Sequence, residues 1–144
     1  MKGVNLYDLQ QIKVKNGNIF HALKSTDIGY VDFGEAYFSQ IEYNSVKGWK
    51  RHNLFALNII VPVGKIKFVI YDDRVESDTF GEFVECILSP DYNYKRLTIA
   101  PGLWMAFQGL GDNFSMLLDI IPSPHVSSES DALPIDSIEY DFAL

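Results

Sequence analysis

Short β-prone segments separated by turn signals run through this chain and recur at a spacing of roughly 8–12 residues. The clearest segment is KIKFVIY, residues 65–71, where Ile66, Phe68 and Ile70 form one wholly apolar face. No stretch keeps the 3.6-residue period of a helix for more than about two turns. The sequence therefore predicts an all-β fold, either a sandwich or a barrel.

The same alternation predicts the order of the elements. Asn16 and Gly17 mark a turn between IKVK and IFHALK, which indicates an N-terminal β-hairpin. Further strands are expected in EAYFSQIEY, LNIIVPV, KIKFVIY, EFVECILS, KRLTIA, LWMAFQGL and FSMLLDII. From Pro122 the chain is rich in Pro, Ser and acidic residues, which is typical of an ordered tail or a short helical turn lying on a barrel. We expect one domain over residues 1–144, with an N-terminal hairpin region at 1–33, a barrel at 34–121 and a tail at 122–144.

Composition limits the compartment and the partners. A chain of 144 residues is long enough to bury one core without metals or disulfides. We expect a cytoplasmic protein, because the N-terminus has no apolar signal segment and the single Cys86 has no internal partner. A net charge of −7 argues against nucleic acid or an anionic membrane as a partner.

One cluster of cations stands out in this acidic chain. Lys47, Lys50 and Arg51 immediately precede or flank His52, whereas no Lys or Arg follows Gln108. The cluster is either a site for a small anionic ligand or a solvated strand end.

The residues available for catalysis are few. The chain has three His and one Cys, with no HxH, HExxH or CxxC motif, so a conventional metal site is poorly supported. Cys86 lies in an apolar strand and is expected in the core, His21 is expected to be structural, and His125 is expected at the surface. His52 remains as the main candidate for acid or base chemistry.

From about Gly34 to Phe142 the chain resembles the dTDP-4-dehydrorhamnose 3,5-epimerase family of nucleotide-sugar epimerases, within the cupin superfamily. The resemblance is carried by FGEAYFSQ, VKGWKRH, VPVGKIKFVIYDDR, SDTFGEFVECILSPDYNYKRLTIAPGLWMAF and the terminal IEYDF. It implies a cupin-type jelly-roll barrel or sandwich with a short irregular C-terminal tail. It also implies a homodimer that exchanges N-terminal strands.

The resemblance further implies a site without metal and without any other cofactor. The four positions that carry metal ligands in the general cupin pattern are occupied here by Lys50, His52, Leu57 and Met105. Three of these four side chains are not metal ligands.

Site residues follow from the same resemblance. In this family a His oriented by a carboxylate removes the proton beside a C4 ketone, and a Tyr returns a proton to the opposite face. His52 matches the base, and Asp141 in the terminal motif matches its carboxylate partner. Substrate-binding roles are implied for Lys50 or Arg51 at the diphosphate, Asn58 at the C4 oxygen, Gln40 in the pocket and Trp104 against a ring, although a barrel core also explains buried aromatic residues.

The position of the acid Tyr falls near Leu118, which has no phenol. Tyr37, Tyr71 and Tyr140 are the remaining candidates for a proton donor.

These residues imply an epimerase acting at C3 or C5, or both, of a 4-keto nucleotide-linked deoxysugar in surface polysaccharide biosynthesis. Two alternatives stay open: a nucleotide-sugar 3,4-ketoisomerase, and a non-catalytic cupin that binds a sugar nucleotide.

Overall fold

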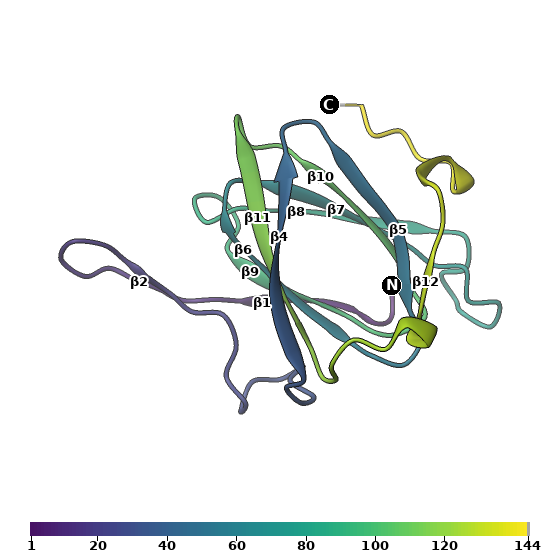
Figure 1. Ribbon diagram of the computed structural model, residues 1–144, viewed down its shortest axis with the longest axis horizontal. Helices are drawn as coiled ribbons and strands as arrows, with labels where there is room; N and C mark the ends of the chain where they lie inside the picture. Colours follow the sequence, from purple (N-terminus) through teal and green to yellow (C-terminus); the bar gives the residue numbers. More distant parts are fainter. Residues whose placement is uncertain (144) are drawn as a thin grey trace.

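The computed structural model describes residues 1–143, which form two facing five-stranded antiparallel sheets (Figure 1). The predicted all-β, cupin-type architecture is confirmed. No helix among the described residues is long and apolar enough to cross a membrane. The helical segments are two short 3-10 turns in the tail, η1 (Ser127–Glu129) and η2 (Ile135–Ser137).

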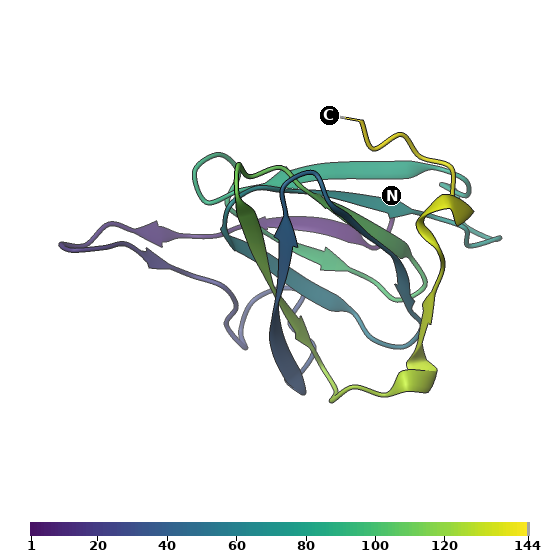
Figure 2. The same ribbon diagram turned by 45° about the horizontal axis from the view of Figure 1, so that its top comes forward.

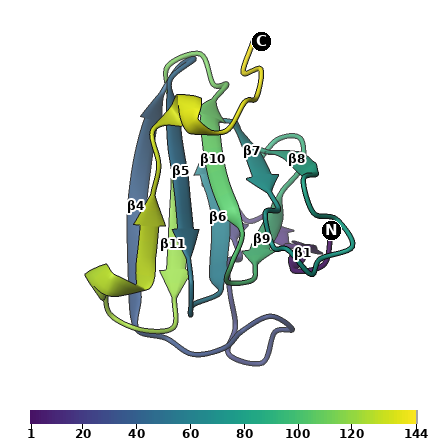
Figure 3. The ribbon, with the colours of Figure 1, turned by 90° about the vertical axis from the view of Figure 1, so that its right-hand side faces the viewer.

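The two sheets contain all of the described strands except β2 and β3. The first contains, in spatial order, β1 (Val4–Asp8), β9 (Lys95–Ile99), β6 (Leu57–Val63), β11 (Phe114–Ile121) and β4 (Glu35–Glu42). The second contains β12 (Ser130–Ala132), β5 (Val46–His52), β10 (Trp104–Gly109), β7 (Ile66–Tyr71) and β8 (Phe83–Leu88). Figure 3 shows β4 and β11 facing β5 and β10 across the barrel.

The main core fills most of the space between the sheets. The apolar face predicted for β7 is buried there, since Ile66, Phe68 and Ile70 are each fully enclosed. In β11 alternate residues point inward, namely Ser115, Leu117, Asp119 and Ile121. Each full burial of a large apolar side chain contributes about 1.5–3 kcal/mol, so this core is the main source of stability.

The predicted N-terminal hairpin is present as a protruding arm. Its strands, β2 (Gln11–Ile12) and β3 (Ile19–Phe20), pair only with each other in the described chain and extend away from the barrel (Figures 1 and 2). Ring packing between Phe20 and Tyr94 holds the base of the arm. The segment before the arm forms β1, which belongs to the first sheet.

The C-terminal tail covers the outer face of the second sheet (Figures 1 and 3). That face is apolar and contains Trp49, Val69, Trp104 and Ala106. Ile138, Tyr140 and Phe142 of the tail pack against it, so alternate residues of the terminal IEYDF motif serve as a cover. The tail also contains one strand that sequence patterning missed, β12, which pairs with β5.

A β-bulge in β5 determines which side chains face the interior. Lys50 pairs with Met105 of β10, and Lys47 pairs with Phe107, so Gly48 and Trp49 together oppose the single residue Ala106. Simple alternation would turn Lys47 away from the face that carries Lys50. The extra residue brings both lysines to the same face.

Gly48 is required at this bulge. Its φ is +147°, and an added Cβ would lie 2.5 Å from the Cβ of Ala106. We expect Gly48→Ala to lower the free energy of unfolding by about 1–3 kcal/mol through steric strain, measured by chemical denaturation.

The matched control is Gly17→Ala in the arm, where φ is +140° and no atom lies within 4 Å of the added Cβ. This control measures the cost of backbone conformation alone. Equal losses in the two variants would contradict the assignment of close packing at Gly48.

Candidate active site

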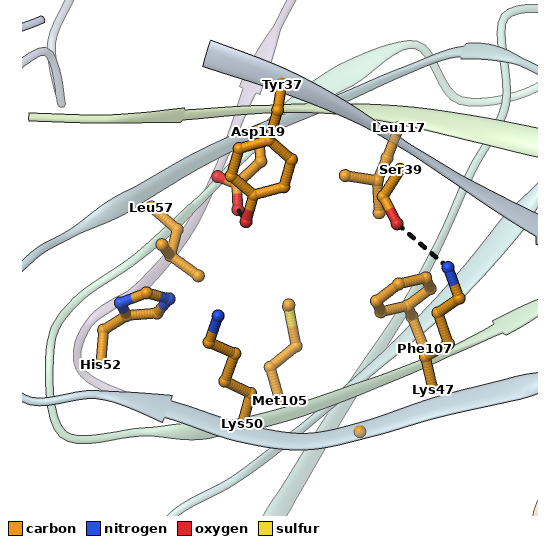
Figure 4. Close-up of a pocket in the computed structure, with 11 residues that line it drawn as sticks. Tyr37, Ser39, Lys47, Lys50, His52, Leu57, Met105, Phe107, Leu117 and Asp119 are labelled. Atoms are coloured by element: carbon orange, nitrogen blue, oxygen red, sulfur yellow. Dashed lines mark hydrogen bonds between the residues drawn. The ribbon is translucent and has the colours of Figure 1, made fainter. Parts of the chain in front are cut away.

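A cavity of about 220 Å³ lies between the two sheets, beside the main core. One wall comes from β5 and β10 and the opposite wall from β4, β11 and the start of β6 (Figure 4). The lining residues are Tyr37, Ser39, Lys47, Gly48, Lys50, His52, Leu57, Met105, Phe107, Leu117 and Asp119. The four positions that the resemblance equated with cupin metal ligands all line this one cavity.

His52 is the buried end of β5, with 7% of its surface exposed. Its Nδ1 lies 2.6 Å from Oε1 of Glu129. A carboxylate only accepts hydrogen bonds, so Nδ1 carries the proton and the Nε2 lone pair remains for the cavity. The pair therefore orients His52 as a base.

Glu129 is held by more than His52. Its Oε2 accepts hydrogen bonds from the backbone N–H groups of Leu54 and Phe55. Burial alone would raise the pKa of Glu129, but these backbone donors and His52 outweigh it and hold the pKa below its ordinary value. Glu129 is consequently an ionised partner at neutral pH.

The prediction that Asp141 is the carboxylate partner of His52 is wrong, because Glu129 occupies that position. Asp141 is exposed near the end of the chain, and its Oδ1 accepts a hydrogen bond from the backbone of Ala143. The physical reason is alternation, because Tyr140 and Phe142 face the barrel and turn Asp141 outward. Glu129 was missed because its position depends on the three-residue strand β12, where Ser130 pairs with His52.

The cation cluster is divided between two faces. Lys50 lines the cavity, whereas Arg51 points to the outer face, where it bonds Asp131 at 2.7 Å and lies 4.4 Å from the ring centre of Trp104. Lys47 lies at the cavity edge and bonds Ser39 Oγ at 3.3 Å (Figure 4). Of the two residues predicted for the diphosphate, Arg51 is thus outside the cavity.

Three other predicted binding residues also lie outside the cavity lining. Asn58 is buried on the far side of β6, where it bonds Arg96 and the backbone of Gly29. Gln40 is exposed on β4, which alternation turns to the outer face of the sheet. Trp104 is packed under the tail and donates to Asp73.

The wall opposite His52 carries a second polar pair. The hydroxyl of Tyr37 donates to Oδ2 of Asp119 at 2.9 Å, from adjacent strands β4 and β11. Asp119 is 4% exposed, and desolvation by burial raises its pKa to about 6. Burial, together with the charge of Asp119, also raises the pKa of Tyr37 above its ordinary value.

Asp119 was missed although the sequence held a signal for it. FSMLLDII alternates, and Asp119 shares the parity of Leu117 and Ile121, which predicts an inward-facing carboxyl. Of the candidate donors, Tyr37 lines the cavity, while Tyr71 and Tyr140 pack on the outer face of the second sheet.

The described residues 1–143 contain no group of three or more His, Cys, Asp or Glu side chains placed to hold a metal ion. Arg74 forms an ion pair with Asp72, at 2.8 Å, and this pair lies away from the cavity.

No family model matches the chain. Sugar isomerases and epimerases are nevertheless similar to it in sequence and structure. A crystal structure of a dTDP sugar isomerase from Desulfovibrio desulfuricans G20 has a TM-score of 0.94 and 35% identity, over 98% of this chain and 91% of that one. A probable low-salt glycan biosynthesis epimerase of Haloferax volcanii, Agl13, is 29% identical over 118 residues, which is 81% of this chain and 75% of the relative.

A more distant structure shares the fold. The dTDP-4-dehydrorhamnose 3,5-epimerase of Sulfolobus tokodaii has a TM-score of 0.84 and 24% identity, over 97% of this chain and 82% of that one.

The raised pKa of Asp119 predicts a pH-dependent stability difference. Between about pH 3.8 and 6 the folded protein holds this proton more tightly than the unfolded chain, so stability falls as pH rises through this window. The effect is about 3 kcal/mol when the window has been crossed. We expect Asp119→Asn to gain about that much relative to the wild type between pH 3.5 and pH 8.

Denaturation of both proteins across this pH range gives the difference. Glu129 and Asp72 titrate in both the wild type and the variant, so their contributions to the pH dependence of stability cancel in the difference. A difference that does not change with pH would show that Asp119 titrates normally.

Proposed function

The chain belongs to the dTDP-4-dehydrorhamnose 3,5-epimerase family as a divergent member, and we propose that it is an epimerase of a 4-keto sugar linked to a nucleoside diphosphate. The observation that carries the proposal is the cavity in which His52, oriented by Glu129, shares one wall with Lys50. The name of the Haloferax relative supports a role in making a glycan. The proposal includes a cytoplasmic location, as expected from the single unpaired Cys86.

His52 is the base in this proposal. Protons on carbons beside a ketone become acidic when the resulting enolate is stabilised. Nε2 of His52 takes such a proton, and the C–H electron pair moves to place negative charge on the C4 oxygen. Glu129 stabilises the imidazolium that forms.

Lys50 is the group that stabilises the enolate oxygen. It replaces Asn58 in this role, because Lys50 lines the cavity beside His52 and Asn58 lies behind β6. An ammonium in a partly enclosed cavity, such as that of half-buried Lys50, stabilises developing negative charge more than water does. Lys47, at the cavity edge beside Ser39, is placed for the diphosphate.

The test is exchange of substrate hydrogen with solvent. A 4-keto dTDP sugar is incubated in D2O, and deuterium at C3 and C5 is followed by NMR. We expect His52→Asn to slow exchange by about 100- to 10,000-fold, the usual contribution of a general base, and Lys50→Gln to slow it by about 100- to 1,000-fold.

Arg51→Gln is the matched control, because it removes the neighbouring cation that faces away from the cavity. We expect its exchange rate to stay near that of the wild type. If no 4-keto nucleotide sugar exchanges with wild-type protein, the proposed function fails.

A 3,4-ketoisomerase is the second candidate, favoured by the name of the Desulfovibrio relative, a dTDP sugar isomerase. The same base and enolate would serve, but the carbonyl would move from C4 to C3. The carbon NMR spectrum of the product separates the two reactions. A binding protein without activity would instead bind the nucleotide sugar and show no exchange.

A homodimer is part of the proposal. The arm is an isolated two-stranded hairpin, which has marginal stability in water unless it packs against something else. Apolar side chains are also exposed on the nearby segments and on the outer face of β4, including Ile19, Ile28, Val31, Phe33 and Phe38. A second copy that receives the arm would cover these groups.

We expect Phe38→Asp to convert the dimer to a monomer, because it places a charge in the proposed interface. Phe38 is 64% exposed. Val75→Asp is the control, since Val75 is 83% exposed in the loop after β7. Sedimentation velocity measures the state, and a wild-type monomer at all concentrations would contradict the expectation.

A further inference from the structure

Inversion of a carbon needs a proton donor on the face opposite the base. His52 and Lys50 both come from β5, so their shared wall supplies the base and the enolate contact. The facing wall must supply the donor. Among the described residues that line that wall, Tyr37, Ser39 and Asp119 carry a proton that can be given, and Ser39 lies beside Lys47 at the cavity edge, away from His52 (Figure 4). Tyr37 and Asp119 are therefore the candidates.

Asp119 has an oxygen with no partner. Its Oδ2 is bonded to Tyr37, but its Oδ1 is buried and has no hydrogen-bond partner among residues 1–143. An ionised carboxylate oxygen buried without a donor is costly. Protonation of the carboxyl removes the charge and with it most of that cost.

The surroundings of Asp119 are mixed in charge. Tyr37 and Glu35 face it from β4, and His52 and Lys50 act on it from β5. Its neighbour on β6 is Ile59, and the β10 residues of the cavity, Met105 and Phe107, are apolar. Burial dominates and raises the pKa of Asp119 to about 6, despite the opposing effects of Tyr37, His52 and Lys50.

We propose that Asp119 is the proton donor of the epimerase, acting from the wall opposite His52, with Tyr37 as the residue that positions it. This inference rests on the proposed function. After His52 has taken the substrate proton, the enolate C=C pair forms a new C–H bond with the proton from the Asp119 carboxyl, the carboxyl becomes a carboxylate, and the C4 ketone reforms. His52 and Asp119 then exchange protons with water and return to their starting forms.

Tyr37 is less suited to donate directly. Its hydroxyl proton is committed to Asp119 Oδ2. Its pKa is raised above the ordinary value by burial and by the charge of Asp119. A Tyr that fixes the carboxyl rotamer holds Asp119 in the cavity wall opposite His52.

The test is Asp119→Asn with a 4-keto dTDP sugar in D2O. We expect deuterium to enter the unconverted substrate at a rate within a few-fold of the wild type, because His52 still removes and returns the proton on its own face. We expect inverted product to form at least 100-fold more slowly. Inversion at the wild-type rate would overturn the proposal.

Equal loss of exchange and inversion in a folded Asp119→Asn protein would also overturn it, since Asp119 would then not act on the second face alone. Absence of deuterium exchange with the wild-type protein is a different result, and it rejects the proposed function itself. Thermal unfolding of the variant establishes that it is folded.

Tyr37→Phe provides a second test that keeps the carboxyl. The Tyr37 hydrogen bond lowers the pKa of Asp119, so its removal raises that pKa. Because the donor must be protonated, wild-type kcat/KM for inversion should fall as pH rises above about 6. In the Tyr37→Phe variant we expect inversion to be retained, and we expect the fall in kcat/KM to begin at a higher pH than in the wild type. If Tyr37→Phe abolishes inversion while Asp119→Asn does not, Tyr37 is the donor and the proposal is wrong.

Discussion

The buried hydrogen bond between Glu129 and His52 joins the two parts of the molecule on which the site depends. It fixes the C-terminal tail to β5 through a residue directly before β12, and it fixes the tautomer of the imidazole at the same time. The backbone donors of Leu54 and Phe55 satisfy the second carboxylate oxygen, so the burial of this charge is compensated. A carboxylate with these bonds is stable only when the tail is seated on the barrel.

The cavity has two walls with opposite electrostatic character. The β5 wall carries Lys50 and His52, which is suited to stabilise an anion and accept a proton. The β11 wall carries Asp119, whose burial is unfavourable for folding above its pKa. A group that lowers the stability of the folded state, yet lines a cavity and keeps one buried oxygen without a partner among residues 1–143, is typical of a site where stability is lost in favour of chemistry.

Strand patterning predicted most of the fold, because each barrel strand buries one face and therefore alternates. The same rule explains two failures. Asp141 shares the parity of an exposed face between Tyr140 and Phe142, and Asp119 shares the parity of buried Leu117 and Ile121; both were readable from alternation. Resemblance to a family fixed the region of the site but not which carboxylate fills it.

Two features of the site could not be predicted from any local sequence pattern. The bulge at Gly48 shifts Lys47 onto the inward face, and a shift of this kind depends on the pairing with Ala106 across the sheet. Glu129 reaches His52 only because the three-residue strand that follows it pairs with β5. A pairing of that length is set by tertiary contacts and not by the propensity of its own residues.

The central claim is that a sugar carbon lies between His52 and Asp119. A crystal structure with a dTDP-linked 4-keto sugar, or a stable analogue, tests it most directly. The account predicts that Nε2 of His52 and a carboxyl oxygen of Asp119 lie on opposite faces of one carbon beside C4, each within about 3.5 Å of it. A sugar bound outside this cavity, or both groups on the same face of the ring, would contradict it.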